Sequence, residues 1–122
     1  MLSTQTKDRL SKLATPNVVY RYECDICHLQ YIGLTERRLE ERVKEHAPRW
    51  AMLGLHGMSQ SSVTDHIVGE GHPCNRQEAF EIIYRARNRR LLKYVEAVAI
   101  RFLRPTLNIM KEFDYKLKLP WS

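Results

Sequence analysis

Short runs rich in β-branched and aromatic residues alternate along the chain with longer runs that have a helical repeat. The first run, residues 18–23 (VVYRYE), predicts a β-strand, and residues 28–32 predict the strand that returns beside it. Residues 24–27 form the turn between them, so the three segments predict a β-hairpin. A third strand is predicted over residues 79–86 (AFEIIYRA).

A helix is predicted over residues 36–47 (ERRLEERVKEHA), with Thr35 as its N-cap and Glu36 at the positive end of the helix dipole. Its apolar positions recur every four residues, at Leu39, Val43 and Ala47. The neighbouring stripe has the same spacing, at Arg38, Arg42 and His46. We therefore expect two arginines and an imidazole to line one edge of a packed helix.

Two further helices are predicted. The longest covers residues 88–103 and ends before Pro105. A shorter helix begins at Ser62, a suitable N-cap residue, and ends at the glycines that follow, Gly69 and Gly71.

The chain has 122 residues, enough for one hydrophobic core and a single domain. Residues 1–16 are polar and predict a lead-in or linker before a domain of residues 17–122. Within that domain, residues 48–60 have no clear period and predict a loop, while residues 106–122 predict an ordered tail. No apolar run has the length of a membrane span or the character of a signal peptide, so we expect neither membrane insertion nor secretion.

Charge changes this picture only mildly. Twenty Lys and Arg residues against 14 Asp and Glu give a formal net charge of +6, which favours a polyanionic partner such as nucleic acid. The arginines gather in two stretches, at Arg37, Arg38 and Arg42 and at Arg85, Arg87, Arg89 and Arg90.

Three cysteines in a chain without signs of secretion favour a metal site or core packing over a disulfide framework. Cys24 and Cys27 at the hairpin tip have the spacing of a zinc knuckle, which needs two more ligands. His66 and His72 supply them, so we expect a structural Zn²⁺ that joins the hairpin to a distant segment. Cys74 is the alternative fourth ligand. A Cys-x-x-Cys that arose by chance is a weaker interpretation. A redox pair is also weaker, because a redox Cys-x-x-Cys stands at the start of a helix rather than at the tip of a hairpin.

Glu96 is unusual because it lies within the apolar stripe of the last predicted helix. That stripe consists of Leu92, Val95, Ala99 and Leu103. A carboxylate in such a place is costly unless it meets a cation. An ion pair with a nearby arginine is one interpretation, and a divalent metal that also binds water and a substrate phosphate is the other.

Tyr20 and Tyr31 lie on the two strands of the predicted hairpin. Packing alone explains most tyrosines in strands. Here both rings can also point toward the Arg42–His46 edge of the following helix, which favours a chemical role.

Together these residues resemble the GIY-YIG nuclease domain over residues 18–108. The resemblance rests on Val-Val-Tyr (18–20), Tyr-Ile-Gly (31–33), Thr-x-x-x-Leu-x-x-Arg (35–42), Glu45-His46, Glu96 and Leu107-Asn108. Val18 and Val19 stand where the family name has Gly and Ile, and the tyrosine is retained. The Cys-x-x-Cys between the two tyrosine motifs and the later histidine pair resemble more narrowly the endonuclease domain of Penelope-like retroelements.

The resemblance implies a small α/β (α+β) domain with a three-stranded antiparallel sheet flanked by helices and a hairpin held by zinc. It implies DNA hydrolysis with Mg²⁺ or Mn²⁺ bound at Glu96. The residues that it assigns to the catalytic site are Tyr20, Tyr31, Arg42, His46, Glu96 and Asn108. Arg42 would hold the scissile phosphate. One tyrosine would act as general base, with its pKa lowered by Arg42 and the metal.

The function that follows is a DNA-nicking domain of a Penelope-like retrotransposon. Its cut would leave a 3′-hydroxyl for a reverse transcriptase domain of the same parent polypeptide, which places the protein in the nucleus. The alternatives are a free-standing GIY-YIG repair or homing nuclease and a zinc-stabilised nucleic-acid-binding module without catalysis.

Overall fold

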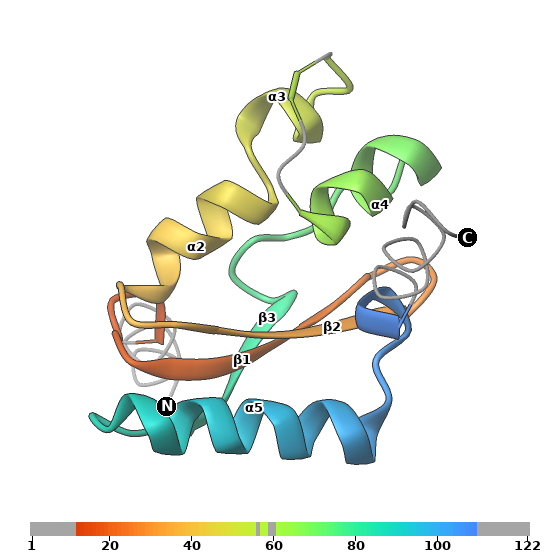
Figure 1. Cartoon of the computed structure of the whole chain (residues 1–122). Helices are drawn as coiled ribbons and strands as arrows, with labels where there is room; N and C mark the ends of the chain where they lie inside the picture. Colours follow the sequence, from red (N-terminus) through yellow and green to blue (C-terminus); the bar gives the residue numbers. More distant parts are fainter. Residues whose placement is uncertain (1–11, 56, 59–60, 110–122) are drawn as a thin grey trace, which may run out of the picture.

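Three antiparallel strands form one sheet in the order β2-β1-β3 in this computed structural model, which describes residues 12–55, 57–58 and 61–109. The chain is an α+β fold in which helices cover both faces of the sheet (Figure 1). Its elements are β1 (Val18–Glu23), β2 (Gln30–Thr35), α2 (Leu39–His46), α3 (Arg49–Met52), α4 (Ser62–Glu70), β3 (Phe80–Arg85) and α5 (Arg89–Leu103).

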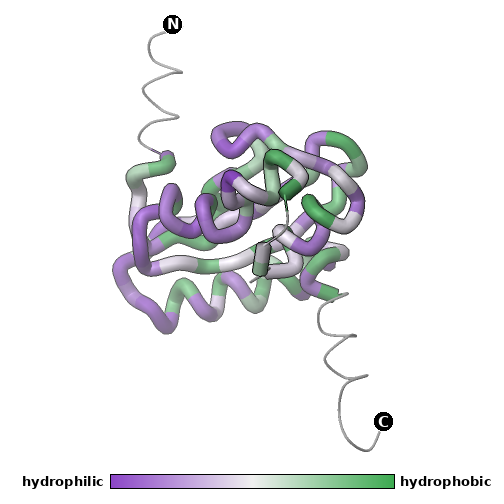
Figure 2. Tube along the Cα trace, turned by 90° about the horizontal axis from the view of Figure 1, so that it is seen from above, coloured by the Kyte–Doolittle hydropathy of each residue, from purple (hydrophilic) through white to green (hydrophobic). Residues whose placement is uncertain are grey.

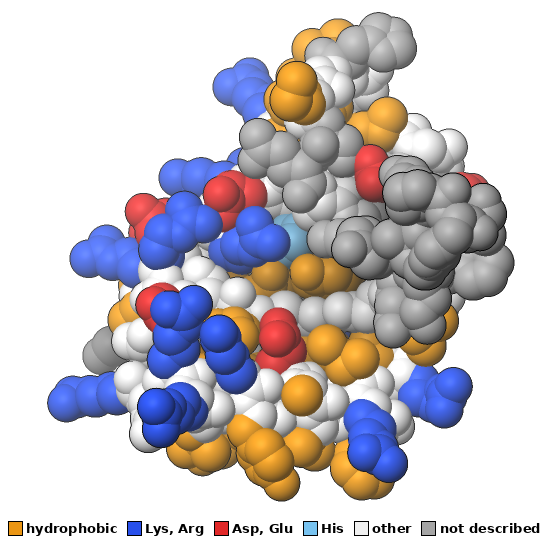
Figure 3. Space-filling model, in the orientation of Figure 1, with side chains coloured by type: hydrophobic (Ala, Val, Ile, Leu, Met, Phe, Trp, Pro, Cys, Tyr) orange, Lys and Arg blue, Asp and Glu red, His pale blue; other side chains and the backbone are white. Residues whose placement is uncertain are grey.

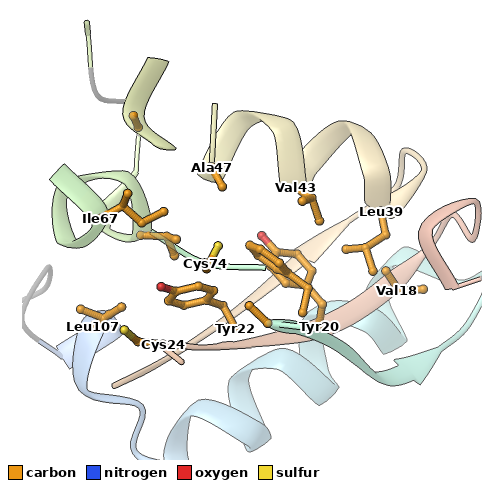
Figure 4. Packing of buried hydrophobic residues seen from close by; sticks show 14 residues of the cluster. Val18, Tyr20, Tyr22, Cys24, Leu39, Val43, Ala47, Ile67, Cys74 and Leu107 are labelled. Atoms are coloured by element: carbon orange, nitrogen blue, oxygen red, sulfur yellow. The ribbon is translucent and has the colours of Figure 1, made fainter. Parts of the chain in front are cut away.

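Strand β1 lies in the middle of the sheet and is buried on both faces. Because side chains alternate along a strand, Tyr20 and Tyr22 point to the face covered by α2 and α4, and Val19 points to the face covered by α5. Figure 4 shows the first of these clusters, in which both tyrosines pack with Val43 of α2 and Ile67 of α4. Hydrophilic and hydrophobic residues alternate along the helical coils, as expected for helices with one buried side (Figure 2).

The predicted strands and the long helix are present, with small shifts in their bounds. Strand β1 covers the predicted residues 18–23, and β3 lies within the predicted residues 79–86. Strand β2 begins and ends later than predicted. Helix α5 begins at Arg89, because the side chain of Asn88 caps its first free N–H groups.

The prediction for the start of α2 was wrong. Thr35 is the last residue of β2, where it pairs with Val18, and its hydroxyl accepts a hydrogen bond from the N–H group of Arg37 in a tight turn. The helix begins four residues later, at Leu39, without a side-chain cap. The N–H group of Leu39 instead donates to the carbonyl oxygen of Thr15 at 3.0 Å. A segment before β1 therefore takes over the capping role.

Two other boundaries differ from the prediction. Residues Arg49–Met52, expected in a loop, form the short helix α3. Ser61 rather than Ser62 caps α4, because the Ser61 side chain accepts from the N–H group of Thr64. Gly71 follows α4 in the left-handed conformation (φ 66°), which ends the helix there.

The predicted lead-in and tail fall partly outside the described residues. Residues 1–11 and 110–122 are not described, so the domain boundary at residue 16 stays a prediction. Leu13 does pack against the core cluster. Among the helices of the described residues, none has both the length and the apolar character needed to cross a membrane.

Candidate functional site

The phenol ring of Tyr20 rests on the backbone of the neighbouring strand. Tyr20 of β1 is paired with Gly33 of β2. A Cβ atom at Gly33 would lie 2.5 Å from the Tyr20 hydroxyl oxygen and 2.7 Å from Cζ, closer than atoms can pack. The absence of a side chain at Gly33 therefore leaves the space that the Tyr20 ring occupies.

The Tyr20 hydroxyl contacts two side chains of α2. It lies 2.6 Å from Nε2 of His46 and accepts a hydrogen bond of 3.2 Å from Nε of Arg42. Arg42 and His46 are four residues apart, so α2 presents both on the same side. Of the edge that the sequence predicted, Arg42 and His46 lie beside Tyr20.

Tyr31 lies beside this group from the adjacent strand. Its ring centroid is 6.5 Å from that of Tyr20 and 5.2 Å from that of His46, and the His46 contact is edge-on. Phe80 of β3 stacks on the imidazole with a centroid distance of 6.0 Å. His46 is fully buried, and its ring is fixed by aromatic rings from all three strands.

The pKa values of both tyrosines are shifted against the sequence-based expectation. Burial raises the pKa of Tyr20 far above its ordinary value, and the nearby Arg42 only partly opposes this. Burial also raises the pKa of Tyr31, again with Arg42 acting in the opposite direction. Both phenols are therefore protonated at neutral pH. Either tyrosine can act as a base only if a neighbour takes its proton, and for Tyr20 that neighbour is His46.

Glu96 of α5 approaches the same tyrosines from the other face of the sheet. Its carboxylate is close enough to raise the pKa of Tyr20 and of Tyr31. Burial raises the pKa of Glu96 itself, and Lys93 lowers it. Across the described residues Glu96 has no ion pair, so the arginine partner considered above is not found there. A half-buried carboxylate of this kind is a suitable ligand for a divalent cation.

A hollow separates α2 from α5 on the face of the molecule seen in Figure 3, and hydrophobic side chains form its floor. Lys and Arg side chains gather at one side of it, over the ends where α2 and α5 begin. Arg37 and Arg38 precede α2, and Arg89 and Arg90 begin α5. Arg89 is joined to Glu36 by an ion pair of 3.0 Å, which links the two ends. The site thus has a cationic border on one side.

Asn108 binds the free edge of the sheet. Its Oδ1 accepts from the Ile32 N–H group at 2.8 Å, and its Nδ2 donates to the Ile32 carbonyl oxygen at 2.9 Å. The oxygen and the nitrogen of the Asn108 side-chain amide therefore both bond to the backbone of Ile32 in β2, the residue after Tyr31. This geometry suits a residue that holds Tyr31 in place rather than one that contacts substrate.

Four side chains converge at the tip of the hairpin, as the sequence predicted: Cys24, Cys27, His66 and His72. One ligand atom from each lies within 4.8 Å of all the others. The cysteines come from the β1–β2 turn, where His28 adopts a left-handed conformation (φ 64°), and the histidines come from α4 and the segment after it.

The spacing of these atoms fits a tetrahedral metal. Cys27 Sγ is 3.2 Å from His66 Nε2, Cys24 Sγ is 3.6 Å from His72 Nδ1, and the two histidine nitrogens are 3.3 Å apart. Zn–S and Zn–N bonds of ordinary length give tetrahedral edges of about 3.6 Å between S and N and about 3.3 Å between two nitrogens. Burial lowers the pKa of His66, which favours the neutral imidazole that a metal requires. The cluster could therefore hold a metal such as zinc.

Cys74, the alternative fourth ligand, does not belong to this cluster. It is buried in the core with Tyr22 and Phe80, and burial raises the pKa of its thiol to about 11. A thiol with so high a pKa remains protonated and serves as a small apolar side chain.

One contact of the site was missed in the sequence. The Ser61 hydroxyl at the start of α4 lies 2.8 Å from Nδ1 of His46 and therefore occupies the second nitrogen of the ring. Ser61 and His46 are fifteen residues apart in the sequence, His46 at the end of α2 and Ser61 just before α4. The sequence indicated only that a serine could cap the helix at this point, and Ser61 and Ser62 are equally suitable for that.

Comparison with known proteins gives no relative. No family model matches the chain, and no curated protein or solved structure is significantly similar to it. The function is therefore inferred from the geometry and chemistry of the site.

Proposed function

We propose that the chain is a metal-dependent DNA endonuclease domain of the GIY-YIG type. The observation that carries the proposal is the Tyr20 hydroxyl, which is held over Gly33 between His46 and Arg42. Glu96 adds a carboxylate that has no ion pair among the described residues and is close enough to affect the same tyrosine. A base, a cation and a metal ligand are the groups that phosphodiester hydrolysis needs.

In the proposed mechanism Tyr20 is the general base. Its oxygen receives the proton of the attacking water while its own proton passes to Nε2 of His46, 2.6 Å away. This transfer avoids the need for a free phenolate, which burial disfavours. Arg42 stabilises negative charge on the tyrosine oxygen and is placed to bind the scissile phosphate.

Glu96 would hold Mg²⁺ or Mn²⁺, and the bound cation would supply Lewis-acid stabilisation of negative charge on the leaving oxygen. Tyr31 packs against His46 in an edge-on arrangement of the two rings and so holds the imidazole in place. Asn108 is proposed to act through Ile32 as a positioning residue for Tyr31. The arginines at the start of α2 and α5 would contact the DNA backbone beside the cut.

The finer proposal is a nicking domain of a Penelope-like retroelement. The Cys24–Cys27 turn and the His66–His72 pair support it, because they occur between and after the tyrosine motifs as in that group. The product would carry a 3′-hydroxyl used by a reverse transcriptase domain of the same polypeptide, in the nucleus. A free-standing repair or homing nuclease would share the catalytic groups, and linkage to a polymerase in the parent gene separates the two.

Plasmid nicking tests the proposal. Supercoiled DNA with Mg²⁺ or Mn²⁺ should yield open circles, and a DNA polymerase should extend the nick without prior phosphatase treatment if the end is a 3′-hydroxyl. The Glu96→Gln variant should be inactive yet folded. Glu41→Gln is the matched control, because Glu41 is an exposed carboxylate on α2. DNA binding without any open circles would instead favour the zinc-stabilised binding module, which the cluster of arginines also suits.

A further inference from the structure

Two arginines at the end of β3 have no acidic partner, unlike a neighbour at the start of α5. Arg85 is the last residue of β3, Arg87 follows two residues later, and both are exposed. Neither takes part in an ion pair among the described residues. Arg89, by contrast, is paired with Glu36 at 3.0 Å. Positive charge that no carboxylate offsets is therefore concentrated where β3 ends.

These two arginines border an open pocket between the segment that enters β1 and the segment that leaves β3. Its lining residues are Pro16, Asn17, Arg85, Ala86 and Arg87. The backbone holds the two segments together, because the N–H group of Ala86 donates to the carbonyl oxygen of Asn17 at 3.2 Å. Asn17 has a left-handed conformation (φ 56°), which asparagine adopts more readily than most residues. The pocket is thus built on backbone contacts at one end of the sheet.

The size and chemistry of this arginine pocket suit an anion with several oxygen atoms. Its volume is about 420 Å³, and ligand sites commonly have about 300–1,000 Å³. The lining offers two guanidinium groups and the amide of Asn17, and none of its five residues carries a carboxylate. A guanidinium forms two parallel hydrogen bonds to a phosphate and stays charged at neutral pH. A phosphate group is therefore the ligand that the lining fits best.

We propose that the arginine pocket binds a phosphate group of the DNA backbone, with Arg85 and Arg87 as the residues that contact it. It is a binding site separate from Arg42, which is proposed to hold the scissile phosphate. The choice of DNA as the source of the phosphate rests on the proposed function, whereas the affinity of the pocket for phosphate does not.

Strand β1 links the arginine pocket to the proposed general base. Arg85 pairs with Val18, and Val18 precedes Tyr20 by two residues, about 7 Å along the strand. Successive phosphates of one DNA strand are spaced about 3.4 Å apart along the helix axis. A DNA strand with its scissile phosphate at Arg42 needs only a few nucleotides to place another phosphate in the pocket. Such a contact sets the position of the DNA and takes no part in the chemistry.

The test is DNA binding by the whole chain without added Mg²⁺ or Mn²⁺, measured by fluorescence anisotropy with a short labelled duplex at several salt concentrations. Replacing Arg85 and Arg87 together by alanine should weaken binding about tenfold. The slope of the logarithm of affinity against the logarithm of salt concentration should become less steep by about one, because one phosphate contact is lost.

The matched control removes the same charge from the other end of α5. Arg101 and Arg104 are exposed and have no ion pair among the described residues. Arg101 lies about 18 Å along the helix from Arg89, which is beyond the Debye length of about 10 Å at about 0.1 M salt. Arg101→Ala with Arg104→Ala should leave the affinity and the slope near those of the wild type. An equal loss in both double variants would reduce the effect to net charge and overturn the inference.

Inorganic phosphate separates the two sources of the ligand. Its addition should shift the NMR signals of the Arg85 and Arg87 Nε–H groups, and DNA should displace it. If phosphate bound there while the Arg85/Arg87 double variant held DNA as tightly as the wild type, the pocket would serve a free phosphate and the DNA assignment would fail. Tighter binding of a polyglutamate peptide than of DNA through these arginines would also overturn it.

The plasmid assay distinguishes this inference from the proposed function. A wild-type protein that binds DNA through the arginine pocket but makes no open circles would overturn the endonuclease and leave the pocket intact. Nicking by the wild type, with unchanged DNA affinity in the Arg85/Arg87 double variant, would overturn the pocket and leave the endonuclease intact.

Discussion

Tyr20 and Gly33 face each other across the β1–β2 pair so closely that the phenol occupies the space of the missing Cβ atom. This relationship explains why a glycine stands at this point of a strand, where it is otherwise unfavourable. In this position the Tyr20 hydroxyl contacts both His46 and Arg42, so a ring displaced by a side chain at Gly33 is expected to lose these contacts.

Gly33→Ala is therefore expected to displace the Tyr20 ring. The loss of stability should be about 1–3 kcal/mol, as for other overpacked sites, and nicking should be abolished. Urea denaturation and the plasmid assay measure the two effects. Gly69→Ala is the control, because a Cβ atom at Gly69 of α4 meets nothing within 4 Å, and it should leave both properties unchanged or raise stability slightly.

Tyr20→Phe removes only the hydroxyl and should lower the nicking rate about 100-fold or more, because the water loses its base. The fold should persist, since the ring still packs on Gly33. The chain offers a matched control in Tyr22→Phe, two residues along the same strand. The Tyr22 hydroxyl lies beside the Cys24 thiol rather than beside His46 or Arg42, so its removal should leave nicking intact. Equal activity of the two variants would refute the role of Tyr20.

Much of this site was predictable because its residues obey local periodicities. The i, i+4 spacing of Arg42 and His46 placed both on one side of α2, and the alternation within strands placed Tyr20 and Tyr31 on the face toward that helix. The Cys-x-x-Cys turn predicted the cluster of two cysteines and two histidines, because two close thiols need two further donors to hold a tetrahedral metal.

The parts that were not predictable depend on contacts between distant segments. Thr35 has the side chain of an N-cap, but its pairing with Val18 keeps it in β2. Two adjacent serines look alike as caps, and only the position of His46 distinguishes Ser61 from Ser62. The pKa of Tyr20 depends on complete burial, which overrides the effect of Arg42, and no local pattern reports burial of that degree.

The metal cluster should contribute to stability as well as to the arrangement of α4. The purified protein should contain about one Zn²⁺ per chain, and Cys27→Ser should lower both the metal content and the melting temperature. Cys74→Ala is the control for loss of a thiol and should retain the metal, because Cys74 lies outside the cluster. An unchanged metal content in Cys27→Ser, measured by atomic absorption, would contradict the assignment of this ligand.

The ionised carboxylate of Glu96 is expected to lower the stability of the fold, although the proposed metal binding requires it. Burial raises its pKa in the folded state above the ordinary value, so the folded protein binds this proton more tightly than the unfolded chain does. The ionised carboxylate therefore destabilises the fold at pH values above the folded pKa. Below the ordinary pKa of a glutamate, about 4.3, both states are protonated and the penalty disappears. Stability should fall as the pH rises through this interval.

In the absence of divalent metal, Glu96→Gln should therefore be more stable than the wild type at pH 7, and the difference should shrink as the pH approaches about 4. Mg²⁺ or Mn²⁺ should reverse the order at pH 7, since the cation binds only the carboxylate and stabilises the state that it binds. Thermal denaturation of both proteins with and without metal measures this. If Mg²⁺ and Mn²⁺ raised the melting temperature of Glu96→Gln as much as that of the wild type, Glu96 would not be the ligand of the metal.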